Sequence, residues 1–576
     1  MSPLDWIILA FTLTVIIAYG LYKSRTSKNL EGYILSNRSL PWGLILLSIM
    51  GTQASAITFL AAPGQAYTDG MRFVQYYFGL PLAMIVICIF FVPIFSKLKV
   101  YTAYEYLENR FDGKTRTLTS FLFLLQRGVS TGISVFAPSL ILSSLLGWNI
   151  YWTNLFMGGL LIIYTISGGA KAVAYTQQLQ LIIIFTGMFL AAYMVVHMLP
   201  DTVGFIDALK VTGSMGKLNV ITTGFEKGNG FDWGDKYNIW SGVIGGFFLS
   251  LSYFGTDQSQ VGRYLTAKSL TESRMGLLIN GLVKVPMQFA ILLIGTLVFT
   301  FYLFNNAPLF FNQTQIAKIE NSVYKDSLKV VQNQYDYISG QKKTAVSSYV
   351  NAQTKVQSNE TAGQLKILQK QSDSLRKKVK GWINSKEIKG EDNDTNYIFL
   401  RFVTDNLPAG LVGLLIAIIF LASWGSIAAA IHSLASSTMI DFHKRFSKKT
   451  FTEKSDYHVS KYYTLAWGVF CIIIAMYAHN MGNSLIETVN ELGSIFYGPT
   501  LGVFLVALFF KKITSGTSVF YATLITQLLI FAIYIPAKLK LIGLGFLWLN
   551  PIGAFGVILF TLLINQFLNK KRNPAV

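Results

Sequence analysis

The sequence predicts an all-α polytopic membrane protein with about thirteen transmembrane helices. Apolar runs of roughly 20 residues recur along the chain, and each is long enough to cross the hydrocarbon of a bilayer. Of the 576 residues, 52% are hydrophobic and 13% are charged. A soluble globular domain carries about 25% charged residues, so this composition excludes an ordinary soluble enzyme or nucleic-acid-binding protein. Basic residues also gather in alternate connections, as in polytopic membrane proteins.

Each apolar run is expected to be a helix, because a segment in hydrocarbon must pair its backbone polar groups internally. The expected spans are 3–22, 41–67, 73–95, 118–146, 150–168, 175–199, 239–262, 276–305, 408–440, 462–480, 484–510, 515–536 and 544–568. The first span lacks the basic leader and cleavage site of a signal peptide, so we expect it to be retained. Cys88 and Cys471 both lie in apolar runs, which argues against a disulfide framework or a thiolate metal site.

The positions of Lys and Arg predict the orientation of the chain. The basic connections and tail contain Lys23, Arg25, Lys28, Arg38, Lys97, Lys99, Arg110, Lys114, Arg116, Arg263, Lys268, Arg274, Lys444, Arg445, Lys448, Lys449, Lys511, Lys512, Lys570, Lys571 and Arg572. The opposite connections near 147–150 and 480–483 contain none. We therefore expect the N-terminus outside and the C-terminus in the cytoplasm, in the inner (plasma) membrane. Much of the net charge of +20 then sets topology and does not indicate a nucleic-acid partner.

A polar segment, 312–397, interrupts the apolar pattern and is rich in Gln, Asn, Ser and Lys. The spacing of its apolar residues predicts two amphipathic helices, with a turn near 339–340 or around 359–363. We expect this segment outside the cell. It is either a solvated addition without a role in the chemistry or a docking site for a partner.

Two spans contain stretches of small and hydroxyl-bearing residues, 51–64 and 422–438. Unwound backbone at membrane depth is tolerated only where it lines a cavity or is buried in protein. Freed carbonyls in the first stretch could bind a hard cation such as Na⁺, and close helix packing is the alternative. In the second stretch, we expect His432 to hydrogen-bond a neighbouring helix rather than to bind a metal.

Ionisable residues inside apolar spans are costly, so they mark candidate functional sites. Arg127 and Lys284 lie within spans, and Glu487 and Glu491 lie near the start of one. The Arg127 side chain either reaches the cytoplasmic surface or binds a substrate carboxylate through two parallel hydrogen bonds. Glu487 is expected at the level of the lipid headgroups, exposed. The five His residues are scattered, which argues against an enzyme, and no catalytic residue is assigned.

Several distinctive stretches follow one another along the chain. They are residues 37–41 (Asn-Arg-Ser-Leu-Pro), 101–111, 167–176, 253–258 (Tyr-Phe-Gly-Thr-Asp-Gln) with Arg263 and 266–268, and 439–441 (Met-Ile-Asp). In this order they resemble the sodium/solute symporter family, which includes sodium-coupled transporters of sialic acid, sugars and monocarboxylates. The resemblance covers about residues 25–565, with 312–397 as an insertion.

The resemblance implies the fold of the bacterial leucine transporter, with two inverted five-helix repeats formed by spans two to six and seven to eleven. The broken first helix of each repeat would meet the substrate near the bilayer midplane. The implied parts are an extra N-terminal helix (1–24), core helices one to seven (39–311), the external insertion (312–397), core helices eight to ten (398–512), and C-terminal helices with a basic tail (513–576).

The resemblance also implies one Na⁺ site, made by backbone carbonyls of the first core helix and by carbonyl and hydroxyl groups of the eighth. By position, the site residues are Gly51, Ala54, Ala422, Gly425 and Ser426. Many members carry two adjacent hydroxyl residues here, whereas Gly425 has none and Ser426 would supply the hydroxyl alone. Many members also have Asp where this chain has Gln177, so we expect one coupling Na⁺ per substrate.

Substrate contacts are implied on the first, third, sixth, seventh and tenth core helices. By position they are Gln53, Ser55, Thr58, Arg127, Ser250, Tyr253, Lys284 and Asn490. The run 55–58 is similar to members that transport sialic acid and bind its carboxylate with an Arg on the third core helix. Arg127 lies on that helix, about one turn nearer the cytoplasm, whereas Lys284 is similar to the sugar-transporting members.

The expected function is therefore Na⁺-coupled symport of a small organic solute into the cell by alternating access. A carboxylated sugar such as sialic acid, or another organic acid, is the favoured solute. A neutral sugar or polyol is the alternative, and a transporter-like sensor is a remote one. The implied partners are the solute and the lipid bilayer, with no nucleic acid and no obligate protein partner.

Overall fold

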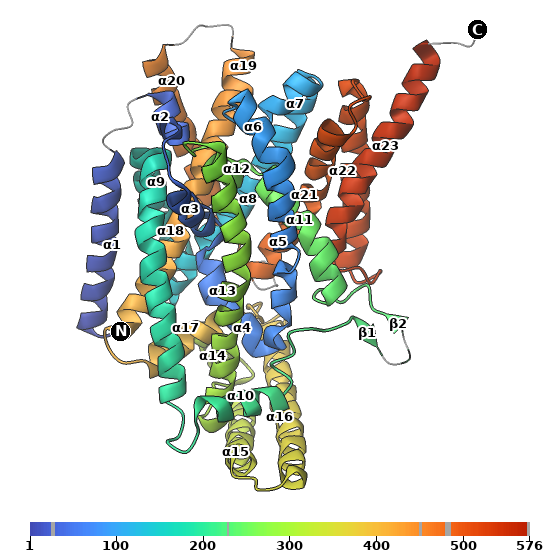
Figure 1. Cartoon of the computed structure of the whole chain (residues 1–576). Helices are drawn as coiled ribbons and strands as arrows, with labels where there is room; N and C mark the ends of the chain where they lie inside the picture. Colours follow the sequence, from blue (N-terminus) through green and yellow to red (C-terminus); the bar gives the residue numbers. More distant parts are fainter. Residues whose placement is uncertain (25–28, 227, 229, 448–451, 479–484, 573–576) are drawn as a thin grey trace.

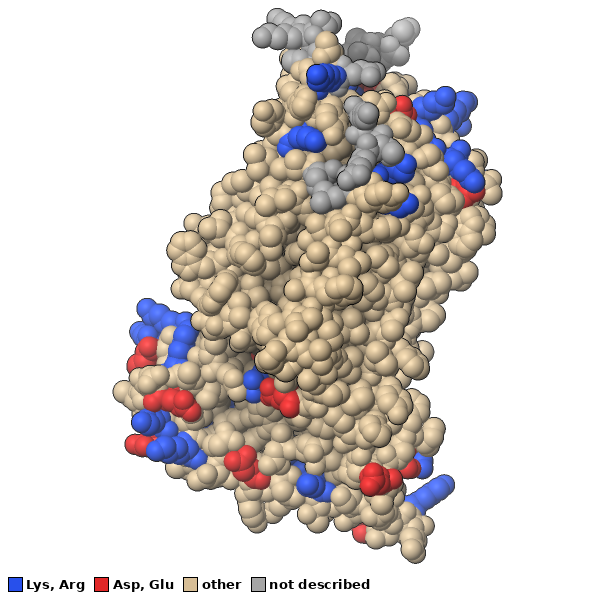
Figure 2. Space-filling view, turned by 90° about the vertical axis from the view of Figure 1, so that its left-hand side faces the viewer, with Lys and Arg blue, Asp and Glu red and all other residues tan. Residues whose placement is uncertain are grey.

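The computed structural model describes residues 1–24, 29–226, 228, 230–447, 452–478 and 485–572. Within these ranges ten helical stretches are long and apolar enough to cross a membrane. Shorter apolar helices span Trp42–Gln53, Ile150–Ile166 and Ser241–Gly255. Together they overlap all of the expected spans, so the prediction of an all-α membrane protein is confirmed. Figure 2 shows a broad band without charged side chains between two charged ends.

The first half of the chain runs from α1 to α12. Its helices are α1 (Pro3–Ser24), α2 (Leu30–Leu35), α3 (Trp42–Gln53), α4 (Ala56–Asp69), α5 (Leu80–Val86), α6 (Val92–Leu98), α7 (Glu105–Arg110), α8 (Gly113–Leu146), α9 (Ile150–His197), α10 (Phe205–Ser214), α11 (Gly246–Gly255) and α12 (Gln258–Tyr264). Short 3₁₀ or π-helical turns join some of them: η1 (Ser36–Arg38), η2 (Gly70–Tyr77), η3 (Ile87–Phe91) and η4 (Ser241–Gly245). A small antiparallel pair, β1 (Phe225–Glu226) and β2 (Gly230–Phe231), lies before η4.

The second half runs from α13 to α23. Its helices are α13 (Leu270–Phe304), α14 (Gln313–Glu320), α15 (Lys325–Val350), α16 (Lys355–Ile383), α17 (Thr395–Asn406), α18 (Leu411–Ser437), α19 (Lys444–Phe446), α20 (Glu453–Tyr477), α21 (Leu485–Phe509), α22 (Gly516–Lys538) and α23 (Leu549–Arg572), with turns η5 (Thr438–His443) and η7 (Phe546–Trp548). Side-chain caps start several of the long helices: Asp112 accepts from the Thr115 amide at α8, and Ser269 from the Glu272 amide at α13. Such caps pair amide groups that the first turn of a helix leaves free.

Two helices break where the backbone becomes extended inside the bundle. Between α3 and α4, Ala54 and Ser55 have ψ angles of 91° and 174°. Between α11 and α12, Thr256 and Asp257 leave the helical conformation, and Asp257 has a ψ of 117°. These breaks fall in the spans at which the two repeats are expected to begin.

The spans expected at 150–168 and 175–199 form one continuous element, α9, with a sharp bend at Gly169. This residue has φ 59° and ψ −179°, a conformation that favours glycine. A Cβ there would also lie 2.9 Å from the Tyr33 ring. The bend therefore requires glycine for its backbone conformation and for the space beside α2.

The polar insertion forms an antiparallel hairpin of α15 and α16 at the same end of the molecule as the N-terminus (Figure 1). We call this the hairpin end; the last helix, α23, finishes at the opposite end. The prediction of two amphipathic helices is confirmed, but both expected turn positions are wrong, because the turn lies at 351–354. Gly340 and Gly363 sit inside the helices, where a glycine costs only about 1 kcal/mol and packing keeps the helix intact.

The hairpin has its own small apolar core and is anchored to the main bundle. The core comprises Leu309, Phe310, Ile319, Leu328, Val331, Tyr335, Val379 and Ile383. At its base the Arg376 guanidinium pairs with the buried Asp394 carboxylate at 2.6 Å and donates to the carbonyls of Pro308 and Leu309. Asp394 directly precedes α17, which packs against α4. The insertion is thereby joined to the half-helix that follows the first break.

Candidate functional site

A polar cavity of about 110 Å³ lies at the α3–α4 break and is bounded by α8, α11, α18 and α21. We call it the central cavity. Seven of the eight predicted substrate residues line it: Gln53, Ser55, Thr58, Arg127, Ser250, Tyr253 and Asn490. They come from segments far apart in sequence, and the fold brings them to one place. Lys284 is not among the lining residues.

The helix break supplies the first wall of the central cavity. The Ala54 amide still donates to the Met50 carbonyl at 2.7 Å, and the next helix starts with Thr58 donating to Ser55 at 2.9 Å. Between these two bonds the chain is extended, so it exposes backbone that a continuous helix would pair. The Oε1 atom of Gln53, also on this wall, has no hydrogen-bond partner among the described residues.

Arg127 forms the facing wall and lies inside the protein, not at its surface. It is 9% exposed, and its guanidinium carbon lies 5.7 Å from the centre of the Tyr253 ring. Its Nε atom has no hydrogen-bond partner, and no ion pair within the described ranges includes it. A buried guanidinium with an unused Nε donor and no ion pair is a strong site for a carboxylate, which can accept two parallel hydrogen bonds.

Three tyrosines complete the cavity and were not predicted from the sequence. The Tyr76 hydroxyl donates to the Asn490 side chain at 3.2 Å, and the Tyr497 hydroxyl donates to the Asp257 carboxylate at 2.9 Å. Tyr77 adds its ring. Aromatic residues in apolar spans look like ordinary core residues, so their sequence context gave little signal.

Polar positions on α8 were also missed. Ser130, Thr131 and Ser134 line the cavity together with Arg127. Ser130 and Ser134 follow Arg127 at intervals of three and seven residues, which places all three on one helix face. That spacing was a usable signal in the sequence.

Lys284 lies behind the cavity wall, on α13. It is fully buried, and its Nζ atom lies 5.6 Å from the centre of the Tyr77 ring with no hydrogen-bond partner in the described structure. Asn280 and Gln288, one turn away on each side, are also fully buried with unpartnered amide groups. The Tyr77 ring therefore stands between Lys284 and the central cavity.

The predicted Na⁺ residues lie around the contact between α3 and α18, where the Gln177 amide connects the two helices. Its Nε2 donates to the Gly425 carbonyl at 3.1 Å and to the Thr52 hydroxyl at 3.2 Å, and its Oε1 accepts from Ser48 at 2.8 Å. A Cβ on Gly51 would lie 2.9 Å from the Gln177 side chain. Gly51 and Gly425 thus both contact Gln177, and Ala54 lies one turn further along α3, at the break.

Ser426 and Ala422 occupy the same face of α18. The Ser426 hydroxyl lies 3.0 Å from the Ala422 carbonyl oxygen and 3.1 Å from that of Ser423. Because the hydroxyl donates its proton to these carbonyls, the lone pairs of its oxygen stay available to a cation. Ser426 also lines the central cavity, so the predicted cation ligands border the predicted substrate residues.

Two further expectations concern single side chains. His432 is buried, and its Nε2 lies 2.9 Å from the Tyr33 carbonyl, so its role as an interhelical hydrogen-bond partner is confirmed. Glu487 was expected to be exposed, and this expectation is wrong, because it is buried and pairs with Lys236 at 3.0 Å. The ion pair offsets the cost of burying the carboxylate near the end of the span.

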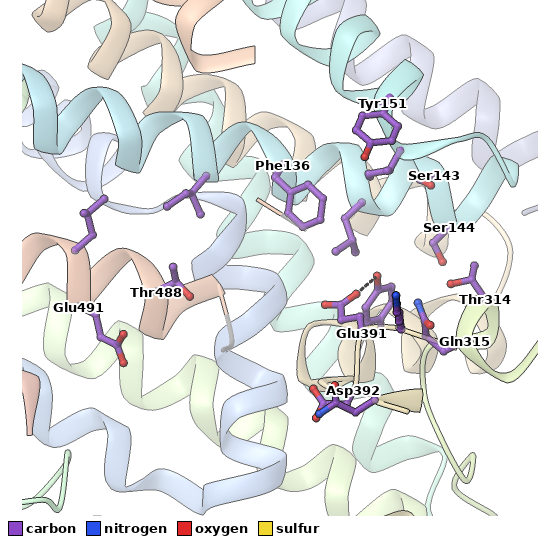
Figure 3. A pocket seen from close by; sticks show the side chains of 18 of the residues that line it. Phe136, Ser143, Ser144, Tyr151, Thr314, Gln315, Glu391, Asp392, Thr488 and Glu491 are labelled. Carbon is purple, nitrogen blue, oxygen red and sulfur yellow. Dashed lines mark hydrogen bonds between the residues drawn. The ribbon is translucent and has the colours of Figure 1, made fainter. Parts of the chain in front are cut away.

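A larger cavity of about 1140 Å³ lies at the hairpin end, between the base of the hairpin and helices α8, α21 and α22 (Figure 3). We call it the vestibule. It contains none of the predicted binding residues, so its size alone does not make it the functional site. The central cavity is the candidate, because it joins the helix break, the unpaired Arg127 and the cation-ligand positions.

Comparison with known proteins agrees with this geometry. The model of the sodium:solute symporter family matches residues 33–329 and 378–525, and the unmatched stretch between them lies in the hairpin. The sodium/sialic acid symporter SiaT of Proteus mirabilis is 24% identical over 522 residues, covering 90% of this chain and 86% of that protein. Sodium-coupled monocarboxylate transporter 1 of Xenopus laevis is 24% identical over 521 residues, covering 89% and 68%.

Among solved structures, a Na⁺-coupled sialic acid symporter in a substrate-bound outward-open state superposes with a TM-score of 0.72. The two chains are 21% identical, and the match covers 98% of this chain and 97% of the other. At this identity the likeness shows the fold. The expected leucine-transporter-like architecture of two inverted five-helix repeats is therefore confirmed.

Proposed function

Because the chain belongs to the sodium:solute symporter family, we propose that it couples Na⁺ entry to the uptake of a carboxylated sugar of the sialic acid class. The observation that carries this proposal is the buried Arg127 guanidinium on the wall of the central cavity, which has no ion pair among the described residues and an unused Nε donor. Relatives that are named sialic acid symporters, SiaT and NanT, match 90% of the chain and support the same solute class.

The carboxylate would pair with Arg127, while the sugar hydroxyls would bind the amide and hydroxyl side chains opposite. Gln53, Ser55, Thr58 and Asn490 supply donors and acceptors suited to that task. A neutral sugar would leave the buried guanidinium uncompensated, which costs several kcal/mol. This asymmetry favours an acid over a neutral sugar or polyol. Lys284 would reach the solute only if the Tyr77 ring moved aside.

The coupling ion would bind where α3 and α18 meet. Carbonyl oxygens of Gly51, Ala54 and Ala422, with the Ser426 hydroxyl, are ligands suited to Na⁺. The Gly425 carbonyl already accepts from Gln177, whose neutral amide joins the two helices without a second cation. This arrangement supports a stoichiometry of one Na⁺ per solute.

Binding of Na⁺ between α3 and α18 would hold these helices in the arrangement that receives solute from outside. Since the ion then raises the affinity for solute, the solute must raise the affinity for the ion by the same factor. Movement of one repeat against the other would next expose both sites to the cytoplasm. The Na⁺ gradient thereby drives uptake.

The protein would lie in the cell membrane with the hairpin end outside. The basic connections around Arg110, Lys114 and Lys444 lie at the end opposite the hairpin, as the positive-inside rule requires of a cytoplasmic face (Figure 1). On this orientation the N-terminus is outside and the C-terminus is cytoplasmic. The solute and the bilayer are the partners that this function needs, and the relatives are transporters, not enzymes.

The direct test is a panel of labelled solutes offered to proteoliposomes of the full chain under an inward Na⁺ gradient. We expect N-acetylneuraminate to be taken up in preference to hexoses, polyols and short monocarboxylates. Na⁺-driven uptake of a neutral hexose with no uptake of the sugar acid would overturn the proposed solute class. Uptake that does not require Na⁺ would overturn the proposed coupling.

A further inference from the structure

The vestibule is built partly by the insertion and partly by the transporter core. From the insertion come residues of α14, including Gln315 and Lys318, and the loop that carries Lys389 and Glu391. Figure 3 shows Gln315 and Glu391 on the opposite side of the cavity from Phe136 of α8. The tip of the hairpin takes no part in it. Among the described residues of the insertion, only those at its base therefore line the vestibule.

The vestibule and the central cavity share two helices. On α8, Val129 and Ile133 line the vestibule, while the adjacent Ser130 and Ser134 line the central cavity. On α21, Thr488 lines the vestibule and Asn490 lines the central cavity. The vestibule and the central cavity therefore border each other along α8 and α21.

One buried amide group at the vestibule has an oxygen without a hydrogen-bond partner among the described residues, which suggests a ligand site. Gln315 is 7% exposed and lines the vestibule, yet its Oε1 has no hydrogen-bond partner in the described part of the chain. Gly390 provides the room for this amide, because a Cβ there would lie 2.2 Å from Oε1. A buried amide oxygen without a hydrogen bond is unfavourable, and a bound polar ligand that donates to it would remove this cost.

The other lining groups suit an acidic polyhydroxy solute. Ser143, Ser144 and Tyr151 supply hydroxyl groups from the core side. Lys318 and Lys389 supply ammonium groups, and neither forms an ion pair with any described residue. The acidic groups are partly engaged, since Glu391 accepts from the Tyr397 hydroxyl at 3.2 Å and Glu491 pairs with Lys538. Asp392 is a third acidic group on this wall.

From these observations we propose that the vestibule is an outer binding site. The carboxylated sugar is held there, against Gln315 and the two lysines, before it enters the central cavity. This inference rests on the proposed function, because it names a second site for the same solute. It gives the base of the insertion a role in solute capture, in place of that of an inert addition.

The first test compares Gln315→Leu with Gln313→Leu in proteoliposomes of the full chain. Gln313 is an exposed residue of the same helix, and it does not line the vestibule. Loss of one ligand hydrogen bond in Gln315→Leu should raise the KM for N-acetylneuraminate about three- to tenfold, with kcat and the Na⁺ dependence unchanged. The control should match the wild-type protein.

The second test measures occupancy directly. The two native cysteines are buried, so Ser144→Cys offers one accessible thiol in the vestibule. In an Arg127→Gln background, which weakens the central site, N-acetylneuraminate should still slow modification of this thiol by a bulky reagent. Adding Gln315→Leu should remove that protection.

The outcomes separate the two proposals. If the wild-type protein shows no Na⁺-driven uptake of the sugar acid, the proposed function is refuted. The proposal of an outer site for that solute is then refuted as well. If uptake is normal but Gln315→Leu behaves like Gln313→Leu and the thiol is not protected, only the outer site is refuted. The vestibule would then be a water-filled approach without affinity.

Discussion

Arg127 is the residue on which the proposed choice of solute depends. It is buried at the central cavity beside Tyr253, and its Nε donor is unused in the described structure. A guanidinium in that setting distinguishes an acid from a neutral sugar, because only the acid neutralises it.

Replacing Arg127 should therefore act on solute affinity more than on Na⁺. A charge-assisted hydrogen bond contributes about 1.5–3 kcal/mol, so Arg127→Gln should raise the KM for the sugar acid roughly 10- to 150-fold. Arg127→Lys keeps the charge but loses the two-pronged geometry, so it should recover part of the affinity. Uptake kinetics at saturating Na⁺ measure the KM for the sugar acid in each of the two variants. An unchanged KM in Arg127→Gln contradicts the assignment.

Ser426 is the residue that tests the cation site. Its hydroxyl is the single side-chain ligand proposed for Na⁺, so Ser426→Ala should raise the apparent KM for Na⁺ while solute KM at saturating Na⁺ changes little. Ser423→Ala is the matched control, since Ser423 is a buried hydroxyl on the same helix whose Oγ has no partner among the described residues. Equal Na⁺ dependence in the two variants would refute the site.

At the residue scale, the predicted positions agree best with the central cavity where a motif fixed them. Gln53, Ser55 and Thr58 follow from one small-residue stretch, and all three line the cavity. Lys284 shows the limit: being ionisable inside a span marks it as unusual, but only the fold shows that the Tyr77 ring covers it. A side chain's access to a cavity depends on neighbours from other helices, which spacing along one helix does not report.

At the scale of elements, the apolar runs predicted every span because a segment in hydrocarbon must pair its backbone polar groups within the protein, which favours helices. The boundaries inside polar regions were less predictable. Glycines at 340 and 363 suggested a turn, but in the structure both lie in helices supported by hairpin packing. The turn forms instead at 351–354, where Thr354 caps α16 by accepting from the Gln357 amide.

The base of the hairpin should respond to pH through Glu391. Burial, with the nearby Asp394 and Asp392, raises the pKa of this carboxyl to about 7, although the Tyr397 hydroxyl partly opposes the shift. The folded-state pKa is above the unfolded value near 4.5, so the stabilising contribution is complete below pH 4.5 and is lost as pH rises through 7.

Amide hydrogen exchange of residues 384–392, corrected for intrinsic rates, measures this response. Protection should fall between about pH 4.5 and 7 in the wild-type protein, because the open form ionises in that range while the folded form stays protonated, and it should stay constant in Glu391→Gln, which cannot ionise. The hairpin tip, around 351–354, serves as an internal control without such a pH step. A loss of protection that persists in Glu391→Gln would contradict the role of this carboxyl.

At the scale of the whole molecule, the charge distribution supports the proposed orientation. A charge-free band separates two charged ends (Figure 2), and the long hairpin lies at one of them (Figure 1). Crossing the band would require moving the hairpin's many Lys and Asp side chains through hydrocarbon, so each end stays on its own side.

Single cysteines test this orientation in intact cells. Because Cys88 and Cys471 are buried, new thiols should dominate labelling. A membrane-impermeant maleimide should label Gln353→Cys in the hairpin turn and should label Lys512→Cys only after the cells are permeabilised. Labelling of Lys512→Cys alone in intact cells would reverse the assignment.

The proposed stoichiometry has a consequence for energetics. One Na⁺ and one singly charged sugar acid carry no net charge, so their symport is electroneutral. A membrane potential of 100 mV is worth about 2.3 kcal/mol per net charge, or roughly 50-fold in accumulation. Symport of a neutral sugar with one Na⁺, or of a sugar acid with two Na⁺, moves one net positive charge inward. An inside-negative potential would therefore raise the accumulation of either solute by that factor. The dependence of accumulation on the membrane potential therefore distinguishes symport of one Na⁺ with one sugar acid from these two alternatives.

The steady accumulation ratio of N-acetylneuraminate in proteoliposomes tests the central claim most directly. It is measured under an inward Na⁺ gradient, with and without an imposed inside-negative potential of 100 mV. The account predicts accumulation that requires the Na⁺ gradient and does not change with the potential. Accumulation without that gradient, or a ratio that grows with the potential, would contradict it.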